Sequence, residues 1–244
     1  MCKNGLSWPL TPAQIGSWLV LLADLGTAAG LLLTSDWTTV DWTVFISYAV
    51  ATVVLLVVGL LTTTSNPVGN VVVERVPGSS RTVFYCTVCE HPVAETTKHC
   101  TNCNRCVDQF DHHCRWINNC VSKKNYSLFV GLAVSVEIKS AATLVLYSLA
   151  FDGGVETVLV VLAGAMLVTY AFVLLANSWL LLMHIYFKAR GLTTYEFLRR
   201  RNARRVQADK APLPTDGGPP VHPPGSMQRT AVAVTEPHED SEQK

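Results

Sequence analysis

The chain has 244 residues, a formal net charge of +1, 49% hydrophobic residues and 15% charged residues. Soluble globular domains carry about 25% charged residues, so this composition argues against an ordinary soluble protein. The charge also argues against a nucleic-acid-binding protein, because the basic residues lie beside apolar segments rather than among base-stacking aromatics. We therefore expect a membrane protein with a small polar domain.

Four long apolar segments cover residues 15–33, 42–62, 128–151 and 158–187. Each reaches the roughly 20 residues that an α-helix needs to cross about 30 Å of hydrocarbon. The first is long enough to be a retained signal-anchor rather than a cleaved signal peptide. The sequence therefore predicts an all-α polytopic membrane protein with four transmembrane helices.

The predicted protein divides into five parts. Residues 1–62 hold the N-terminus and the first two helices, and residues 63–127 form a cysteine-rich domain. Residues 128–187 hold the other two helices, residues 188–206 form a basic segment, and residues 207–244 form a tail.

Lysine and arginine are unevenly distributed between the apolar segments. Residues 35–41 and 152–154 contain neither, whereas residues 63–127 and the stretch after residue 187 contain many. By the positive-inside rule, these two basic regions and both termini lie in the cytosol. Cytosolic thiols are kept reduced, which favours metal binding over disulfide bonds in the cysteine-rich domain.

Seven of the eight cysteines lie in this domain, with the spacing C-x2-C-x9-H-C-x2-C-x2-C-x4-D-H-H-C-x5-C from Cys86 to Cys120. Paired C-x2-C turns are typical of structural zinc sites, which take four thiolate or imidazole ligands. A short polar segment cannot bury enough apolar surface for a core of its own, so bound metal would hold its fold.

The candidate ligands outnumber the places in two closed sites. The seven cysteines with His99, His112 and His113 make ten groups, whereas two tetrahedral sites use eight. The spacing does not say which two groups remain. A cysteine with a histidine would make chemical sense, because such a pair can act as a nucleophile and its base. Asp111 is adjacent and could orient the imidazole.

Two charged residues, Glu137 and Lys139, interrupt the third apolar segment. Charges at such depth are costly and normally face a partner or water. Asp24 in the first segment is a candidate partner for Lys139. A polar cap at Lys139 would lie about 15 Å along the helix from Phe129. It could shorten any cavity between the helices, although a structural salt bridge explains it as well.

The region after the fourth apolar segment is basic. Tyr195, Phe197 and Leu198 lie among arginines in residues 188–206, which predicts an amphipathic segment at the membrane interface. The arginines fit attraction to phosphate groups of a ligand or of anionic lipid, and they fit a plain topology signal equally well. Residues 207–244 are rich in Pro and Gly and then polar, so we expect a disordered tail.

The cysteine framework around Asp111-His112-His113-Cys114 resembles the DHHC family of protein S-acyltransferases (palmitoyltransferases). The resemblance extends over about residues 10–205. Further matches are Trp116, Asn119, Cys120, Asn125, Phe129, the TTYE sequence at residues 193–196 and a degenerate NPV at residues 66–68. Asn66 replaces the usual aspartate, and Ser122 the usual glycine. Ser122 would restrict the backbone if its site needs a positive φ.

The resemblance implies two structural zinc ions whose ligands interleave in sequence, between the second and third helices. The first set is Cys86, Cys89, His99 and Cys106, and the second is Cys100, Cys103, His113 and Cys120. The remaining group is then catalytic. Cys114 would be the nucleophile and His112 its base, with Asp111 holding the imidazole.

The resemblance also implies a reaction. A palmitoyl or other long acyl group would pass from acyl-CoA to Cys114, making the protein a transient lipoprotein, and then to cysteines of substrate proteins. The partners would be membrane-associated proteins with cytosolic cysteines and the lipid bilayer, and not nucleic acid. We expect a multi-pass protein of an endomembrane, Golgi or ER, rather than of the plasma membrane.

In the family the acyl chain occupies a cavity between the helices. Phe129, Leu132 and Val136 follow i, i+3, i+7 spacing and could line such a cavity, although ordinary helix packing gives the same pattern. Thr194 resembles the family threonine that packs near the active site.

Two other functions compete with this one. A catalytically inactive zinc-binding membrane adaptor would use the same cysteines to hold a partner-binding domain. A free thiol beside a base argues against it. A metal transporter would need its ligands at mid-membrane, whereas these lie in a connecting segment.

Overall fold

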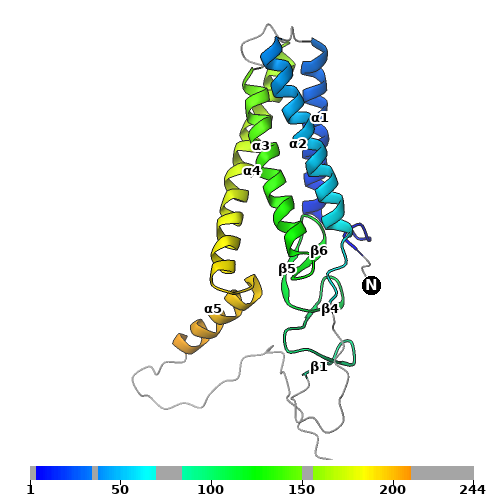
Figure 1. Ribbon diagram of the computed structural model, residues 1–244, viewed down its shortest axis with the longest axis vertical. Helices are drawn as coiled ribbons and strands as arrows, with labels where there is room; N and C mark the ends of the chain where they lie inside the picture. Colours follow the sequence, from blue (N-terminus) through cyan, green and yellow to red (C-terminus); the bar gives the residue numbers. More distant parts are fainter. Residues whose placement is uncertain (1–3, 35–37, 70–83, 150–155, 210–244) are drawn as a thin grey trace, which may run out of the picture.

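The computed structural model describes residues 4–34, 38–69, 84–149 and 156–209 of the chain. Four long helices dominate it: α1 (Pro12–Thr34), α2 (Thr39–Thr64), α3 (Tyr126–Leu149) and α4 (Thr157–Ala189). Each is long and apolar enough to cross a membrane. The predicted all-α polytopic membrane protein is thereby confirmed, with one helix for each apolar segment (Figure 1). The predicted disordered tail after residue 209 lies outside the described residues.

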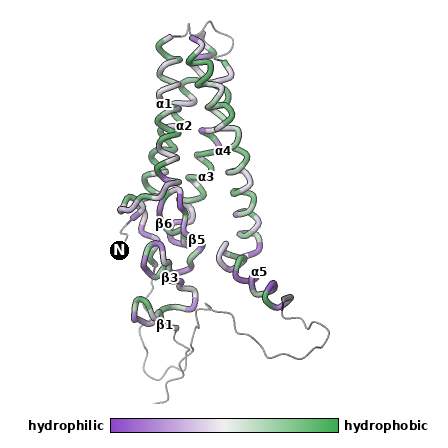
Figure 2. Tube along the Cα trace, turned by 180° about the vertical axis from the view of Figure 1, so that it is seen from behind, coloured by the Kyte–Doolittle hydropathy of each residue, from purple (hydrophilic) through white to green (hydrophobic). Residues whose placement is uncertain are grey.

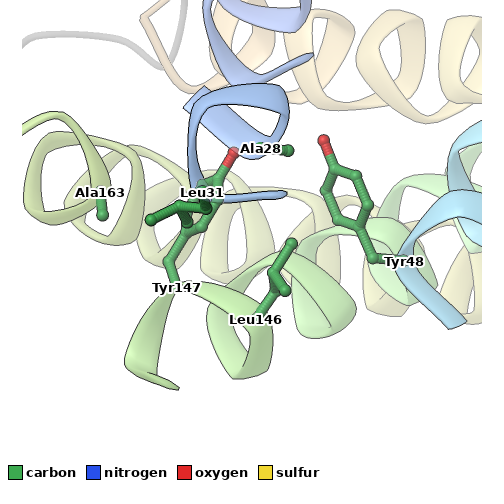
Figure 3. Close-up of a cluster of buried hydrophobic side chains, with 6 residues drawn as sticks. All are labelled: Ala28, Leu31, Tyr48, Leu146, Tyr147 and Ala163. Atoms are coloured by element: carbon green, nitrogen blue, oxygen red, sulfur yellow. The ribbon is translucent and has the colours of Figure 1, made fainter. Parts of the chain in front are cut away.

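The helices run side by side in one long bundle, and the cysteine-rich region lies at one end of it (Figure 1). α3 packs against both α2 and α4, and α1 packs against α4. A core cluster takes side chains from all four helices: Ala28 and Leu31 from α1, Tyr48 from α2, Leu146 and Tyr147 from α3, and Ala163 from α4 (Figure 3). Figure 2 shows hydrophobic colouring along the bundle and hydrophilic colouring through the cysteine-rich region.

The local sequence explains how α2 begins and how polar side chains inside the helices find hydrogen-bond partners. α2 begins with a capping box, in which Thr38 Oγ1 accepts from the Asp41 amide at 3.3 Å and Asp41 accepts from the Thr38 amide at 2.8 Å. Hydroxyls inside the helices donate to carbonyls of the preceding turn, as Thr52 does to Tyr48 at 2.8 Å. Such bonds satisfy a hydroxyl within its own helix, whereas the buried Ser140 hydroxyl of α3 has no hydrogen-bond partner among the described residues.

A buried ion pair joins α1 to α3 inside the bundle. Lys139 Nζ lies 2.7 Å from Asp24 Oδ2, and both side chains are fully buried. Tyr48 and Tyr147 donate hydrogen bonds to the same carboxylate, and the ammonium lies 4.1 Å from the centroid of the Tyr48 ring. The predicted partnership between Asp24 and Lys139 is confirmed. Glu137 instead accepts from Asn177 of α4 at 2.8 Å.

The cysteine-rich region folds as three short antiparallel hairpins, which the sequence did not predict. They pair β1 (Phe84–Cys86) with β2 (His91–Val93), β3 (Lys98–Cys100) with β4 (Arg105–Val107), and β5 (Phe110–Cys114) with β6 (Asn119–Ser122). Glu90, Asn104 and Asn118, which lie in the three turns, adopt positive φ between 47° and 54°. The turns of the first two hairpins carry Cys89 and Cys103, and the other candidate ligands lie on the strands.

Asn119 fixes this region to the end of α2. Its amide donates to the carbonyls of Thr63 and Ser65 at 3.1 and 2.8 Å, and its oxygen accepts from Arg105 at 2.8 Å. Ser122 adopts extended β6 backbone, so the glycine usual there is not needed for a positive φ. Its hydroxyl instead donates to the Pro67 carbonyl at 2.8 Å.

The chain before α1 also packs onto the cysteine-rich region. The Gly5 amide donates to the Thr63 carbonyl at 2.8 Å, and Asn118 donates to the Pro9 carbonyl at 3.1 Å. A Cβ on Gly5 would lie 2.0 Å from the Ile117 carbonyl oxygen, so only glycine fits this close approach. This contact holds the turn that follows Cys114.

Candidate active site and metal clusters

The first cluster brings together Cys86, Cys89, His99 and Cys106. His99 Nδ1 lies 3.8, 3.3 and 3.9 Å from the three sulfurs, in that order. Cys86 and Cys89 come from the first hairpin, whereas His99 and Cys106 face each other across β3 and β4. The two hairpins are therefore joined through one group of ligands.

The second cluster brings together Cys100, Cys103, His113 and Cys120. His113 Nδ1 lies 3.8, 3.4 and 3.8 Å from the three sulfurs. Cys100 and Cys103 come from the second hairpin, and His113 pairs with Cys120 across β5 and β6. This cluster joins the second hairpin to the third.

Both donor sets fit zinc. A tetrahedral ion with bonds of about 2.0 to 2.3 Å separates its ligand atoms by about 3.3 to 3.8 Å, which matches the spacing in both clusters. Three thiolates and one imidazole form a closed set that leaves no place for substrate. These eight residues would hold two ions, and the ions would supply cross-links between hairpins rather than chemistry.

Cys114 ends β5 and belongs to neither cluster. Asp111 and His112 precede it on the same strand. The imidazole Nδ1 of His112 lies 2.7 Å from Asp111 Oδ1, and Asp111 is buried whereas His112 remains 24% exposed. The charge of His112 lowers the pKa of the Cys114 thiol at the end of the same strand. The structure thus brings the three predicted residues together in one row on β5.

The second oxygen of Asp111 is held by α5 (Thr194–Asp209). The Thr194 amide donates to Asp111 Oδ2 at 3.0 Å. Thr193 and Glu196 form a capping box, because Thr193 Oγ1 accepts from the Glu196 amide at 3.1 Å and Glu196 accepts from the Thr193 amide at 3.0 Å. The TTYE sequence therefore starts a helix whose positive end faces the carboxylate. The Thr194 amide thus contacts Asp111, and the supporting role of Thr194 stays a prediction.

These contacts shift the protonation of the row. Burial raises the pKa of the Cys114 thiol, but the hydrogen bond and the charge of His112 outweigh it and leave the pKa below its ordinary value. Burial lowers the pKa of His112, but Asp111 and Cys114 raise it to about 9. Burial likewise raises the pKa of Asp111, and the hydrogen bonds from His112 and Thr194 bring it below the ordinary value. The arrangement favours a thiolate beside an imidazolium.

Sequence reasoning missed His184 of α4, which is buried against this row. Its ring centroid lies 5.6 Å from that of His112 and 5.0 Å from that of Phe129. Its Nδ1 lies 3.1 Å from the Tyr126 hydroxyl oxygen. The signal was present, since a histidine near the end of an apolar membrane segment usually faces the protein interior.

The three residues predicted to line an acyl cavity lie on α3 but have different surroundings. Phe129 is buried, and its ring lies 5.1 Å from that of His112. Leu132 packs beside Phe129 and against the α2 backbone at Gly59. Val136 is half-buried one turn further along. Phe129 therefore places the start of α3 directly beside the candidate base, whereas a cavity beyond it stays a prediction.

Fold and site together define a class: a polytopic membrane protein with two Cys/His clusters that could hold metal ions and a row of Asp111, His112 and Cys114 at one end of its bundle. Residues 82–201 match the family model described as DHHC palmitoyltransferase, and this region of the chain belongs to that family. Members of the DHHC family are protein S-acyltransferases. No curated protein matches the chain.

Proposed function

We propose that this protein is a protein S-acyltransferase that moves a palmitoyl or similar long acyl group from acyl-CoA to cysteines of other proteins. The observation that carries the proposal is Cys114. It lies outside both clusters, and it shares its strand with an imidazole that lowers its pKa and that a buried carboxylate orients. A thiol held only for structure would need neither the base nor the carboxylate.

In the first step, the Cys114 thiolate attacks the thioester carbonyl of acyl-CoA. A new carbon–sulfur bond forms to Cys114 while the bond to the CoA sulfur breaks. The departing CoA thiolate takes the proton held by His112 and leaves as a thiol. Asp111 keeps the imidazole in one orientation throughout, because its other oxygen is fixed by the Thr194 amide.

In the second step, a cysteine of the substrate protein enters in place of CoA. His112 takes its proton, and the resulting thiolate attacks the carbonyl of the acyl-enzyme. Cys114 leaves as a thiolate, which restores the starting state with His112 protonated. Each step exchanges one thioester for another, so the protein supplies placement and a reactive thiolate rather than a driving force.

The position of the row at the end of the bundle supports a membrane-bound acyl donor. Cys114 packs in the same cluster as Phe129 and the half-buried Leu132 at the start of α3. An acyl chain extending from Cys114 between α2 and α3 would pass Phe129, Leu132 and Val136. The substrates would be membrane-associated proteins with cytosolic cysteines, and the enzyme would reside in an endomembrane, Golgi or ER, with both termini in the cytosol.

The test is transfer by the purified full-length protein. Labelled palmitoyl-CoA and a membrane-anchored peptide with one cysteine are added to the protein in lipid nanodiscs. We expect label on the protein first and on the peptide next, with both released by neutral hydroxylamine. A peptide with serine in place of cysteine is the control. Absence of label on a protein that retains two zinc ions would favour the adaptor function instead.

A further inference from the structure

Five arginines meet around one groove between the end of α4 and α5. They are Arg190, Arg200, Arg201, Arg204 and Arg205. Tyr186, Leu192 and Phe197 complete the lining, and the volume is about 540 Å³. We call this feature the arginine groove. Its size falls within the range of about 300–1,000 Å³ that is usual for small-ligand sites.

The groove is built by a fixed turn rather than by a loose chain end. Gly191 has a φ of +61°, and the Leu192 amide donates to the Phe187 carbonyl at 2.9 Å while the Gly191 amide donates to Lys188 at 3.0 Å. This pattern is a Schellman motif, which needs a residue tolerant of the left-handed region. The Phe187 and Phe197 rings then pack with centroids 4.7 Å apart and fix α5 against α4.

No ion pair among the described residues neutralises the charges in the groove. All five arginines are exposed, and neither ion pair in the described part of the chain involves any of them. Arg200, Arg201, Arg204 and Arg205 lie on one face of α5, where like charges one turn apart repel one another. A topology signal requires basic residues here, but it does not require them to converge on one hollow. An anion bound between them would remove the repulsion.

We propose that the arginine groove binds the headgroup of an anionic phospholipid that carries adjacent phosphate groups, as a phosphoinositide does. Guanidinium groups pair with phosphate oxygens through two parallel hydrogen bonds, and several phosphates are needed to match five positive charges. The groove also lies beside the last turn of α4, which contains Lys188 and ends at Ala189, where a long apolar helix gives way to lipid headgroups. Tyr186, Leu192 and Phe197 offer apolar contact to the glycerol and upper acyl chain.

The nucleotide of coenzyme A has similar phosphate chemistry, but the geometry favours lipid. The groove lining includes no residue of the cysteine-rich region and none of Asp111, His112 or Cys114. Arg199, which directly precedes Arg200 on α5, instead lines a separate hollow with Lys98 and Tyr195. The proposed lipid site therefore goes beyond the proposed acyl transfer. The two proposals are independent, so either can be correct without the other.

The experiment measures binding of water-soluble dioctanoyl phosphatidylinositol bisphosphate to the purified full-length protein in detergent. Wild type is compared with Arg200→Gln/Arg204→Gln and with Arg199→Gln, a same-helix substitution outside the groove. Each groove arginine removed should weaken binding roughly fivefold, so the double variant should lose about 25-fold. Arg199→Gln should bind like wild type.

Two further arms complete the test. Dioctanoyl phosphatidylcholine should not compete, and free coenzyme A should displace the phosphoinositide poorly. Thermal unfolding of the double variant should match that of wild type, because the substituted side chains are exposed. Equal affinity of all three proteins for the phosphoinositide would overturn the proposal. Displacement by coenzyme A as effective as by the lipid itself would overturn it in favour of a nucleotide site.

Discussion

The bundle and the cysteine-rich region are stabilised in opposite ways. The bundle buries apolar side chains from four long helices around one ion pair between Asp24 and Lys139. The cysteine-rich region has strands of three to five residues and small clusters built largely from its own cysteines. Hairpins of this length are not stable alone in water, so bound metal would have to replace the missing core. The row of Asp111, His112 and Cys114 lies where the two regions meet.

Removing metal should produce the largest difference between the two regions. A strong zinc chelator should make residues 84–122 sensitive to protease, because structural zinc contributes on the order of 10 kcal/mol to folding of such domains. The four helices should keep their circular dichroism signal. Limited proteolysis and helical content, measured on the same chelated sample, check both statements. Loss of helical signal in parallel with the hairpins would show that the two regions do not fold separately.

Breaking the ion pair should affect the bundle in turn. Asp24→Asn or Lys139→Met leaves one buried charge without its partner, which costs about 3–5 kcal/mol in comparable pairs. The double variant Asp24→Asn/Lys139→Met should recover much of this loss. Thermal unfolding in detergent measures the effect, and zinc content should stay at the wild-type level. A double variant no more stable than either single variant would argue against a direct pair.

The same residues bear on acyl chain length. If Lys139 caps the space beyond Phe129, wild type should turn over C18 acyl-CoA more slowly than C14 or C16, and Lys139→Ala should reduce that difference. Rates with the three donors, measured for both proteins, check this prediction. Equal turnover of all three by both proteins would leave the ion pair with a structural role alone.

A smaller effect is expected on the reactivity of Cys114. Its lowered pKa means that the thiolate persists at pH values below the ordinary midpoint of about 8.5. Alkylation by iodoacetamide should therefore reach half its maximal rate below that pH. In His112→Ala only the backbone amides of Trp116 and Ile117 still oppose the effect of burial on the thiol pKa, so the midpoint should move upward. Mass spectrometry of the Cys114 peptide measures it, and coincident midpoints would contradict the proposed pairing.

The smallest effect concerns the start of α5. Glu196→Ala removes the acceptor for the Thr193 amide and should cost about 1 kcal/mol of local stability. Because Thr194 holds Asp111, acyl-enzyme formation should slow by several-fold. Glu196→Gln keeps an acceptor at the same place and should behave nearly as wild type. Equal rates of acyl-enzyme formation in the alanine and glutamine variants would show that the TTYE sequence does not affect the row of Asp111, His112 and Cys114.

The same contrast explains what could be predicted from sequence. Long apolar runs located all four helices, because length and hydropathy are properties of a segment taken by itself. The hairpins escaped prediction, because their strands are too short for any alternation and their turns use Glu90, Asn104 and Asn118 at positive φ in place of glycine. Charge in an apolar run was enough to suggest that Asp24 meets Lys139.

Contacts between distant segments were the other part that could not be foreseen. His184 reaches His112 from the far end of α4, and residues 4–10 pack on the turn after Cys114. Neither contact is indicated by a local pattern in the sequence. The arginine groove likewise depends on the turn at Gly191, since the arginines alone fit a topology signal equally well.

The most direct test compares two cysteines that lie on paired strands. Cys114→Ser replaces a thiol with a hydroxyl on β5, and Cys120→Ser makes the same replacement on β6. After incubation with labelled palmitoyl-CoA, zinc content and hydroxylamine-sensitive label are measured on each purified protein. We predict that Cys114→Ser retains about two zinc ions, as two closed sites require, and takes no label, whereas Cys120→Ser loses zinc. A Cys114→Ser protein that loses zinc, or that still takes label, would contradict the division between ligands and nucleophile.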